Sequence, residues 1–290
     1  MVVIKTYSTE IGDRLPVHFD TTLTCYPHYL IFSDYEEDLD DRHHVYNALD
    51  GVSDEIKQTS DDFDLYRRLQ AKGRLGLNSS ELSDDRVVLQ GQNGNIDSPG
   101  WRLDKWKFLP MVTRTLEMHP DKQWYVFLET DTHLVWANLL HWLGKLDASQ
   151  PWYLGHQMQI GDIIFAHGGS GFIVSHAAMV NVVELYLAHK SEWEDFTAGH
   201  WAGDAILGKA LAESGAPVVW SWPLMQGVRP AAMEYWRKDY DKRLWCHPAI
   251  SSDHLPPEEL VPMWHLEQSW RRNSVSEPEP SSQHLKTDNN

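Results

Sequence analysis

The stretch WYVFLETDTHL, residues 124–134, constrains the fold more than any other part of the chain. Five apolar or aromatic residues run without a break, and Glu129, Thr130 and Asp131 follow at once. A short unbroken apolar run is typical of a strand that is buried on both faces, as in a parallel sheet. In open α/β sheets, ligands bind beyond the carboxyl ends of such strands. The two carboxylates therefore stand where a ligand site is expected.

The rest of the chain alternates strand-like and helix-like segments. Residues 2–8 and 28–34 are β-branched or aromatic runs with polar ends, and Leu15, Phe19 and Leu23 between them have helical spacing. Such a strand, helix and strand form a βαβ unit. Further helices are expected at 62–75, 101–120, 132–146, 177–190, 204–214 and 257–271, and strands within 151–175 and at 217–222. This order predicts one α/β domain with a mostly parallel central sheet.

Charge and composition exclude several classes of protein. There are 42 acidic and 25 basic residues, so the net charge of −17 argues against a nucleic-acid partner. No run approaches the roughly 18 apolar residues of a membrane span. The acidic segment 34–41 predicts a solvated loop or helix face, residues 77–100 a long surface loop, and residues 273–290 a disordered tail. Cys25 and Cys246 are compatible with one disulfide or with two thiols.

Glu129 and Asp131 would repel each other at a shared strand end unless a cation lay between them. Mg²⁺ or Mn²⁺ suits such a site, because both ions accept carboxylate oxygens and complete their shells with waters and phosphates. A metal with room left for a diphosphate implies a nucleotide substrate. The alternative is that Asp131 merely caps a helix that begins at Thr132, since Asp is common at that position.

Two later motifs carry the same ambiguity. AHGGSGFIVS, residues 166–175, places three glycines within four residues between apolar strands, and glycines let a ligand approach the backbone closely. It lacks the Lys-Ser/Thr ending of a Walker phosphate loop, and an ordinary tight turn is the alternative. In GDAILGKAL, residues 203–211, Asp204 stands where a helix begins, and there an N-cap is the alternative.

The order of these motifs resembles the fringe-like glycosyltransferases of family 31, which include core 1 β-1,3-galactosyltransferase, and their fungal members most of all. The motifs are the acid-x-Asp-Thr strand end, PWYLG, HGGSGFIVS, GDAILGKAL and WCHPAISSDHLPPEEL, and they cover roughly residues 2–270. The resemblance implies a GT-A fold over residues 1–272, with nucleotide binding mainly in 1–130 and the metal, catalytic and acceptor groups in 131–272. It further implies an inverting, Mn²⁺- or Mg²⁺-dependent transferase of the β-1,3 type, which moves a hexose or N-acetylhexosamine from a UDP-sugar to an acceptor hydroxyl.

The resemblance also assigns roles to residues. Asp131 matches the last acid of the family's three-acid motif and would hold the metal, with Glu129 and Thr130 at the two preceding positions on the nucleotide side. Asp204 matches the catalytic base. The glycine turn would line the donor and acceptor cleft, and its members are Gly168, Gly169, Ser170 and Gly171.

One departure from the family concerns a second metal ligand, which the family supplies as a His in a segment that follows a Cys. Counted from Cys246, the matching position here is Asp253, and the neighbouring His254 is the other candidate. Asp holds Mn²⁺ as well as His does and suits Mg²⁺ better. Fungal members also often carry cysteines before the catalytic Asp, where this chain has HWAGD. Their disulfide arrangement is therefore not carried over.

Four further residues are each given a binding role, and each also has a simple structural alternative. Thr6 and Asp34 end the first two strands and would contact the base and ribose of the nucleotide, although Asp34 also suits the start of a turn. Lys105 would reach a phosphate, although most such lysines lie on the surface. Trp201 would stack on the acceptor, although most Trp side chains belong to the core.

Two rival functions remain open from the sequence. One is a catalytically weak homologue that binds UDP or a sugar, supported by Asp253 and opposed by the presence of both Asp131 and Asp204. The other is a metal-dependent hydrolase of UDP-sugars. The acceptor is open among a glycan, a glycoprotein, a lipid and a small metabolite. Location is open as well: the Golgi lumen if an N-terminal anchor precedes this chain, and the cytoplasm otherwise.

Overall fold

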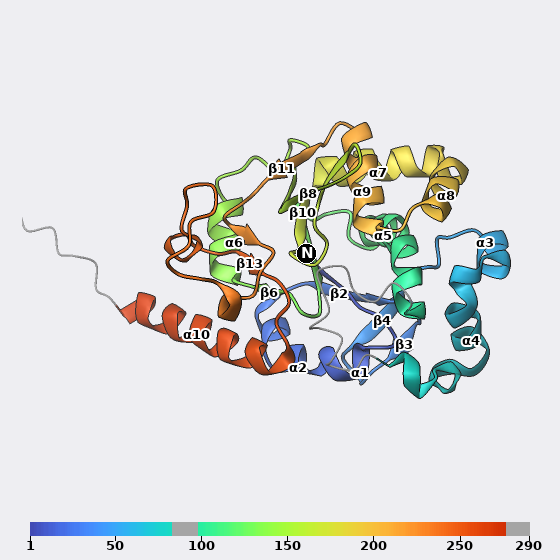
Figure 1. The fold of residues 1–290 in the computed structure, drawn as a ribbon, viewed down its shortest axis with the longest axis horizontal. Coiled ribbons are helices and arrows are strands. Elements are labelled where there is room, and N and C mark those ends of the chain that lie inside the picture. Colours follow the sequence, from blue (N-terminus) through green and yellow to red (C-terminus); the bar gives the residue numbers. More distant parts are fainter. Residues whose placement is uncertain (83–97, 277–290) are drawn as a thin grey trace, which may run out of the picture.

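A computed structural model describes residues 1–82 and 98–276 of the chain. Its centre is an eight-stranded sheet in the order β11-β7-β10-β5-β1-β2-β4-β3 (Figure 1). Within the described residues, four of the seven strand pairings are parallel, which confirms the predicted mostly parallel α/β sheet. The strands are β1 (Val2–Lys5), β2 (Tyr29–Ser33), β3 (Glu37–Asp38), β4 (His44–Asn47), β5 (Trp124–Glu129), β7 (Tyr153–Gly155), β10 (Phe172–Ser175) and β11 (Val218–Trp220).

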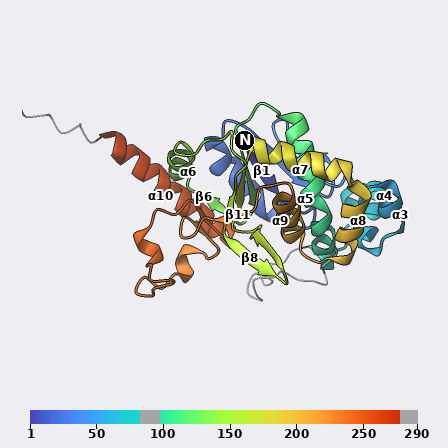
Figure 2. The same ribbon diagram turned by 90° about the horizontal axis from the view of Figure 1, so that it is seen from above.

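Helices cover both faces of this sheet because successive side chains of each strand point to opposite faces. On β5, Tyr125 and Phe127 belong to one core, and Val126 and Leu128 belong to the other. Figure 2 shows the two helix layers on either side of the sheet. The first core contains α5 (Pro99–Met118), α7 (His176–Ala188), α8 (Lys190–Gly199) and α9 (Gly203–Glu213), and the second contains α1 (Ile11–Arg14), α2 (Pro16–Phe19) and α6 (Trp136–Leu143).

A small three-stranded sheet joins distant parts of the chain. It has the order β12-β13-β6, with β12 (Met225–Gln226), β13 (Ser251–Ser252) and β6 (His133–Leu134). Ser252 pairs with His133, so the residues after β13 lie against the residues before β6. This pairing brings the predicted second metal segment to the end of β5.

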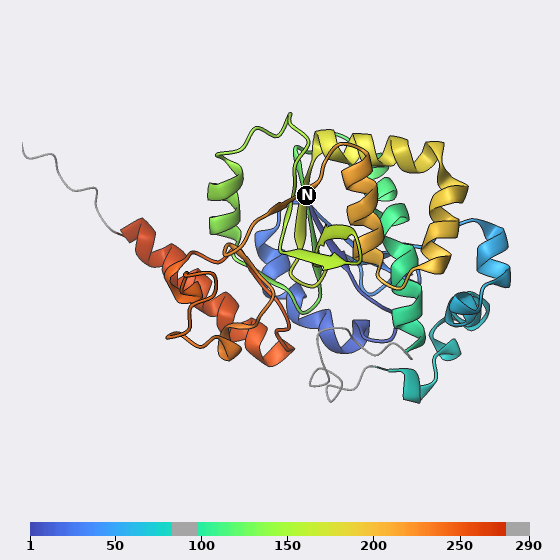
Figure 3. The same ribbon diagram turned by 45° about the horizontal axis from the view of Figure 1, so that its top comes forward.

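The remaining elements lie around this frame. The hairpin β8 (Gln157–Ile160) and β9 (Ile163–Ala166) precedes the glycine turn, while α3 (Asp54–Thr59) and α4 (Asp64–Lys72) pack near the start of α5. Figure 3 shows α10 (Pro257–Ser276) at one end of the molecule, beside the segment that leads to it. The Cys25 thiol lies 3.4 Å from the Nε2 atom of Gln268 on α10. Cys25 and Cys246 are both free thiols.

The structure corrects the helix expected at 132–146. Residues 133–134 pair as β6, and α6 begins only at Trp136, after Val135. The helix predicted between the first two strands is also interrupted, because Pro16 starts a new helix where it needs no backbone N–H partner. Long-range pairing and a proline therefore override the local helical spacing.

Three segments differ from the expected loops and tail. The acidic segment 34–41 contains the short strand β3, and its first residue, Asp34, is fully buried. The helix α10 continues to Ser276, so residues 273–276 of the expected tail are helical. Of the loop expected at 77–100, residues 79–81 form a 3₁₀ turn and Pro99 begins α5. Within these segments, residues 83–97 and 277–290 lie outside the described residues.

Candidate active site

The end of β5 turns sharply before β6 begins. The backbone N–H of Thr132 donates to the carbonyl of Glu129 at 3.2 Å, and the Thr132 hydroxyl accepts the N–H of Glu129 at 3.2 Å. The same hydroxyl donates to the carbonyl of Gly169 at 2.6 Å, which fastens the strand end to the glycine turn. Because α6 begins at Trp136, Asp131 is not a helix cap. The simpler alternative for this acid is therefore wrong.

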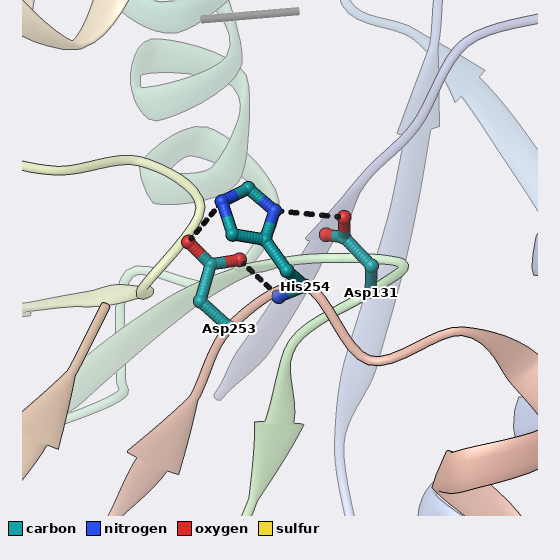
Figure 4. A group of neighbouring side chains, drawn as sticks. All are labelled: Asp131, Asp253 and His254. Atoms are coloured by element: carbon teal, nitrogen blue, oxygen red, sulfur yellow. Dashed lines mark hydrogen bonds and ion pairs between the residues drawn. The ribbon is translucent and has the colours of Figure 1, made fainter. Parts of the chain in front are cut away.

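Asp131, Asp253 and His254 converge beyond this strand end, and one ligand atom from each lies within 4.8 Å of the others. Figure 4 shows the His254 ring between the two carboxylates. Its Nδ1 atom is 3.8 Å from Asp131 Oδ2, and its Nε2 atom is 3.6 Å from Asp253 Oδ2. The sequence left Asp253 and His254 as alternatives, and the structure brings both to Asp131.

The charges in this cluster depend on one another. Burial raises the pKa of Asp131, but His254 and Arg14 outweigh burial and hold that pKa below its usual value. The Asp131 carboxylate, 3.8 Å from the ring, is the largest cause that raises the pKa of His254, to about 9. Burial, and then the charge of Asp131, raise the pKa of Asp253 well above its usual value. The cluster thus brings together two carboxylates and an imidazole, and a single bound cation could contact all three.

The residues of the cluster fit a divalent metal. Asp253 is fully buried, and its Oδ2 atom has no hydrogen-bond partner within the described part of the chain. A buried carboxylate oxygen without a donor is costly, whereas a bound cation would satisfy it. A Cβ atom at Gly169 would come within 2.7 Å of this oxygen, so only glycine lets the Asp253 carboxylate lie this close to the turn. Two carboxylates and one imidazole suit Mn²⁺, and Mg²⁺ would rely on the carboxylates.

A backbone hydrogen bond and a glycine with positive φ define the shape of the glycine turn. The N–H of Gly171 donates to the carbonyl of Gly168 at 2.9 Å, and Gly171 has a φ of 75°, in the region that favours glycine. Ser170 is buried, with its hydroxyl 2.9 Å from His167 Nδ1 and its carbonyl bonded to the Ser251 hydroxyl at 2.6 Å. The side chain of Ser170 thus faces the interior, while Gly168 and Gly169 lie against the acidic groups of the site.

Asp204 lies in the first turn of α9, and Ala202 occupies the N-cap position. One Asp204 carboxylate oxygen accepts the N–H of Gly168 at 3.0 Å, and the other accepts the N–H of Ala205 at 2.8 Å. Burial raises the pKa of Asp204 to about 6 despite these two donors. An oriented carboxylate with a pKa near neutrality has the properties of a general base.

A buried cation that the sequence analysis missed connects β1 with β5. Lys5 pairs in register with Glu129, and its ammonium lies 3.1 Å from Glu129 Oε1 and also in close contact with Asp104 of α5. Glu129 also borders Gly168, since a Cβ atom at that glycine would lie 3.3 Å from Glu129 Oε1. The signal was present in the sequence: a lysine ends an apolar strand, as the acid ends β5. Only the pairing of the two strands shows that these charges meet.

A second missed pair, Arg14 and Glu10, lies against Asp131. Arg14 Nη1 is 3.0 Å from Asp131 Oδ2, and Arg14 Nε is 3.6 Å from Glu10 Oε2. Glu10 accepts hydrogen bonds from the hydroxyls of Thr6 at 3.2 Å and Thr130 at 3.1 Å. The expected nucleotide-side residues Thr6 and Thr130 are both buried and face Glu10.

Asp34 has no exposed surface in this structure. Its carboxylate accepts the N–H of Ser8 at 2.8 Å and the Ser8 hydroxyl at 2.7 Å, and it lies 3.3 Å from the ammonium of Lys107. Lys107 is equally buried and donates to the carbonyl of Thr6 at 2.9 Å. The pair fixes the backbone at the ends of β1 and β2. Asp34 thus holds this edge of the sheet in place by its contacts with Ser8 and Lys107.

Lys105 and Trp201 lie on the α5–α9 side. The ammonium of Lys105 is 2.9 Å from Asp62 and 3.3 Å from the carbonyl of Ala198, so it faces the helices around α5. Trp201 stacks on Trp101 with ring centroids 6.0 Å apart. It also stacks on His200, with ring centroids 6.3 Å apart, and the side chain is 43% exposed.

No protein-family model matches the chain. In the described ranges 1–82 and 98–276, no helix combines the length and the apolar character that crossing a membrane requires.

Proposed function

We propose that the chain is an inverting, metal-dependent glycosyltransferase that moves a hexose or an N-acetylhexosamine from a UDP-sugar to an acceptor hydroxyl, with a GT-A fold. The observation that carries the proposal is the meeting of Asp131, Asp253 and His254 beside a glycine turn that also holds Asp204. A cluster that could hold a metal ion and an oriented carboxylate lie on one edge of the sheet, beyond the end of β5. The order of sequence motifs supplies the reaction class.

Asp131, Asp253 and His254 would hold the divalent ion, which is Mn²⁺ in the first instance. Bound there, such an ion neutralises the charge that develops on the leaving UDP. The buried Oδ2 atom of Asp253, which accepts no hydrogen bond within the described residues, and the close approach of this carboxylate to Gly169 support this assignment.

Asp204 performs the proton transfer in this proposal. The acceptor hydroxyl attacks the anomeric carbon of the donor, the bond from that carbon to the UDP oxygen breaks, and the hydroxyl proton passes to Asp204. The N–H groups of Gly168 and Ala205 hold the carboxylate in one orientation, and a pKa of about 6 leaves it ionised at neutral pH. A single displacement with one base inverts the anomeric configuration and needs no covalent intermediate.

The binding part of the proposal uses the edge formed by β1, β2 and α1. Thr6, Thr130 and Arg14 gather around Glu10 next to Asp131, and Lys5 holds Glu129 next to Gly168. A nucleotide at the ends of these strands would lie where open α/β sheets bind their ligands. Trp201, which is 43% exposed, is the proposed acceptor platform, since aromatic rings bury large apolar areas at little entropic cost.

Release of UDP from a panel of UDP-sugars tests the proposal. The wild-type chain is compared with Asp131→Ala and Asp204→Asn, each with Mn²⁺ and with EDTA. Asp195→Asn is the matched control, because Asp195 lies exposed on α8. One donor is expected to be consumed by the wild type and the control only when metal is present.

The variants are expected to fail for different reasons. Asp131→Ala should lose metal-dependent UDP binding, whereas Asp204→Asn should bind UDP normally and turn over no donor. A rate that is unchanged by adding candidate acceptors would identify a UDP-sugar hydrolase in place of a transferase. If UDP binds and no donor is consumed with any acceptor, the chain is a binding protein.

A further inference from the structure

Arg14 lies against the carboxylate that the metal needs. Its Nη1 atom is 3.0 Å from Asp131 Oδ2, and that same oxygen lies 3.8 Å from His254 Nδ1. The arginine side chain is 16% exposed, so solvent screens this contact only in part. The oxygen that would bind a cation is therefore already neutralised by a guanidinium.

The guanidinium is anchored on its other side. Arg14 Nε lies 3.6 Å from Glu10 Oε2, while Glu10 Oε1 is fixed by the hydroxyls of Thr6 and Thr130. Glu10 is 9% exposed, and Arg14 is four residues further along the chain. A guanidinium carries five N–H donors in a rigid fork, so an anchor at Nε leaves its Nη groups able to change partner.

A bound divalent ion would change how strongly Arg14 interacts with Asp131. Two cations that share one carboxylate repel each other, so metal binding weakens the contact between Arg14 and Asp131. The Arg14 Nη groups then need another anion within reach. A diphosphate on the metal has the right charge, and its oxygens match the planar arginine fork.

We propose that Arg14 is a partner-exchanging clamp: it neutralises Asp131 while the metal is absent, and it binds the diphosphate of the nucleotide once the metal is in place. This inference rests on the proposed function, because it assumes a metal and a nucleoside diphosphate at this site. Arg14 opposes binding of the metal alone and favours binding of the metal together with the nucleotide. A purely structural ion pair would not give effects of opposite sign.

Calorimetry with the intact chain tests this proposal through two dissociation constants, one for Mn²⁺ alone and one for UDP at saturating Mn²⁺. Arg14→Met removes the guanidinium and retains an apolar stem. The double variant Glu10→Gln/Arg14→Met also removes the charge that would be left unpaired, which guards against loss of folding. Arg114→Met is the control, because Arg114 is an exposed arginine that pairs with Glu117 on α5.

We expect Mn²⁺ alone to bind both Arg14 variants several-fold more tightly than the wild type, and UDP to bind them about tenfold more weakly, as loss of a charge-assisted contact implies. The control should match the wild type in both constants. Constants that do not change, or that move in the same direction, would overturn the clamp while leaving the proposed function intact. If wild-type protein binds neither Mn²⁺ nor UDP, the proposed function and the clamp are both wrong.

Discussion

Lys5 and Glu129 end two neighbouring parallel strands at the same level of the sheet, and their charged groups lie 3.1 Å apart. The two strands are otherwise apolar, so this ion pair marks the change from packed core to polar edge. Asp104 reaches the same ammonium from α5. The arrangement holds Glu129 beside Gly168, with one ammonium shared between two carboxylates.

Replacing Lys5 with Met should destabilise the fold. The change leaves Glu129 and Asp104 facing each other without their cation, and the unfolding free energy should fall by about 3 kcal/mol, as when one partner of a buried pair is removed. Urea unfolding of the wild type and Lys5→Met measures this loss. Lys122→Met is the control, because Lys122 pairs with the exposed Asp121 and its loss should change the unfolding free energy by less than about 1 kcal/mol. Equal effects would show that Lys5 does not stabilise the edge.

The buried pair of Asp34 and Lys107 predicts a pH-dependent contribution to stability. Burial raises the pKa of Asp34, but Lys107 and the Ser8 donors outweigh it, so the folded-state pKa lies below the unfolded value of 3.8. Its contribution is fully present above 3.8 and is lost as the pH falls through the lower folded-state pKa. Asp34→Asn should cost about 3–5 kcal/mol at pH 7, since it leaves Lys107 buried and unpaired.

The difference in unfolding free energy between wild type and Asp34→Asn should shrink as the pH falls below 3.8. Chemical unfolding at a series of pH values measures it. Asp64→Asn is the control, since the Asp64 side chain is 66% exposed where it pairs with Arg68. A difference that stays constant through the acid range would mean that the Asp34 carboxylate is not the stabilising species.

Three neighbouring strands of the central sheet could be predicted from the sequence because each is a local apolar run that ends in polar residues, whereas β4 (His44–Asn47) was not predicted. The runs around Ile4, Ile31 and Phe127 gave β1, β2 and β5 in this way. The start of α6 could not be predicted in the same way. His133 and Leu134 have helical spacing with the residues after them, and only their pairing with β13, more than a hundred residues later, makes them a strand.

The candidate site likewise has a part that the sequence predicts and a part that only the structure shows. Motif order placed Asp131, Asp204 and the segment of Asp253 and His254, whereas the ion pairs of Arg14 and Lys5 depend on tertiary contacts that no local pattern encodes. Arg14 sits in a four-residue helix and meets an acid more than a hundred positions away. Buried charges that compensate one another are therefore the part of the site that required the structure.

Asp204 predicts the pH dependence of turnover. A general base must be ionised, so kcat/KM should fall as the pH drops through about 6 and level off above that value. In Asp204→Asn, kcat should decrease by about 10²–10⁴-fold and the acid limb should disappear, while the Kd of UDP stays the same. Initial rates across the pH range give both quantities. An acid limb that persists in Asp204→Asn would assign the base to another residue.

Substitution of Gly169 is expected to weaken metal binding without preventing the protein from folding. A methyl group at this position would approach Asp253 Oδ2 to 2.7 Å and displace the carboxylate. Gly169→Ala should weaken Mn²⁺ binding by about 10–100-fold, the range seen when groups that orient metal ligands are disturbed. Titration calorimetry measures the affinity, and Gly199→Ala is the control because nothing lies within 4 Å of its added Cβ atom. Wild-type affinity in Gly169→Ala would argue against Asp253 as a ligand.

UDP affinity with and without metal tests the central claim most directly. Calorimetry would compare the wild type and Asp253→Asn, each with Mn²⁺ and with EDTA. We predict that UDP binds the wild type tightly with Mn²⁺, weakly with EDTA, and weakly to Asp253→Asn under both conditions. Equal UDP affinity in all four experiments would contradict a metal-diphosphate site at Asp131, Asp253 and His254.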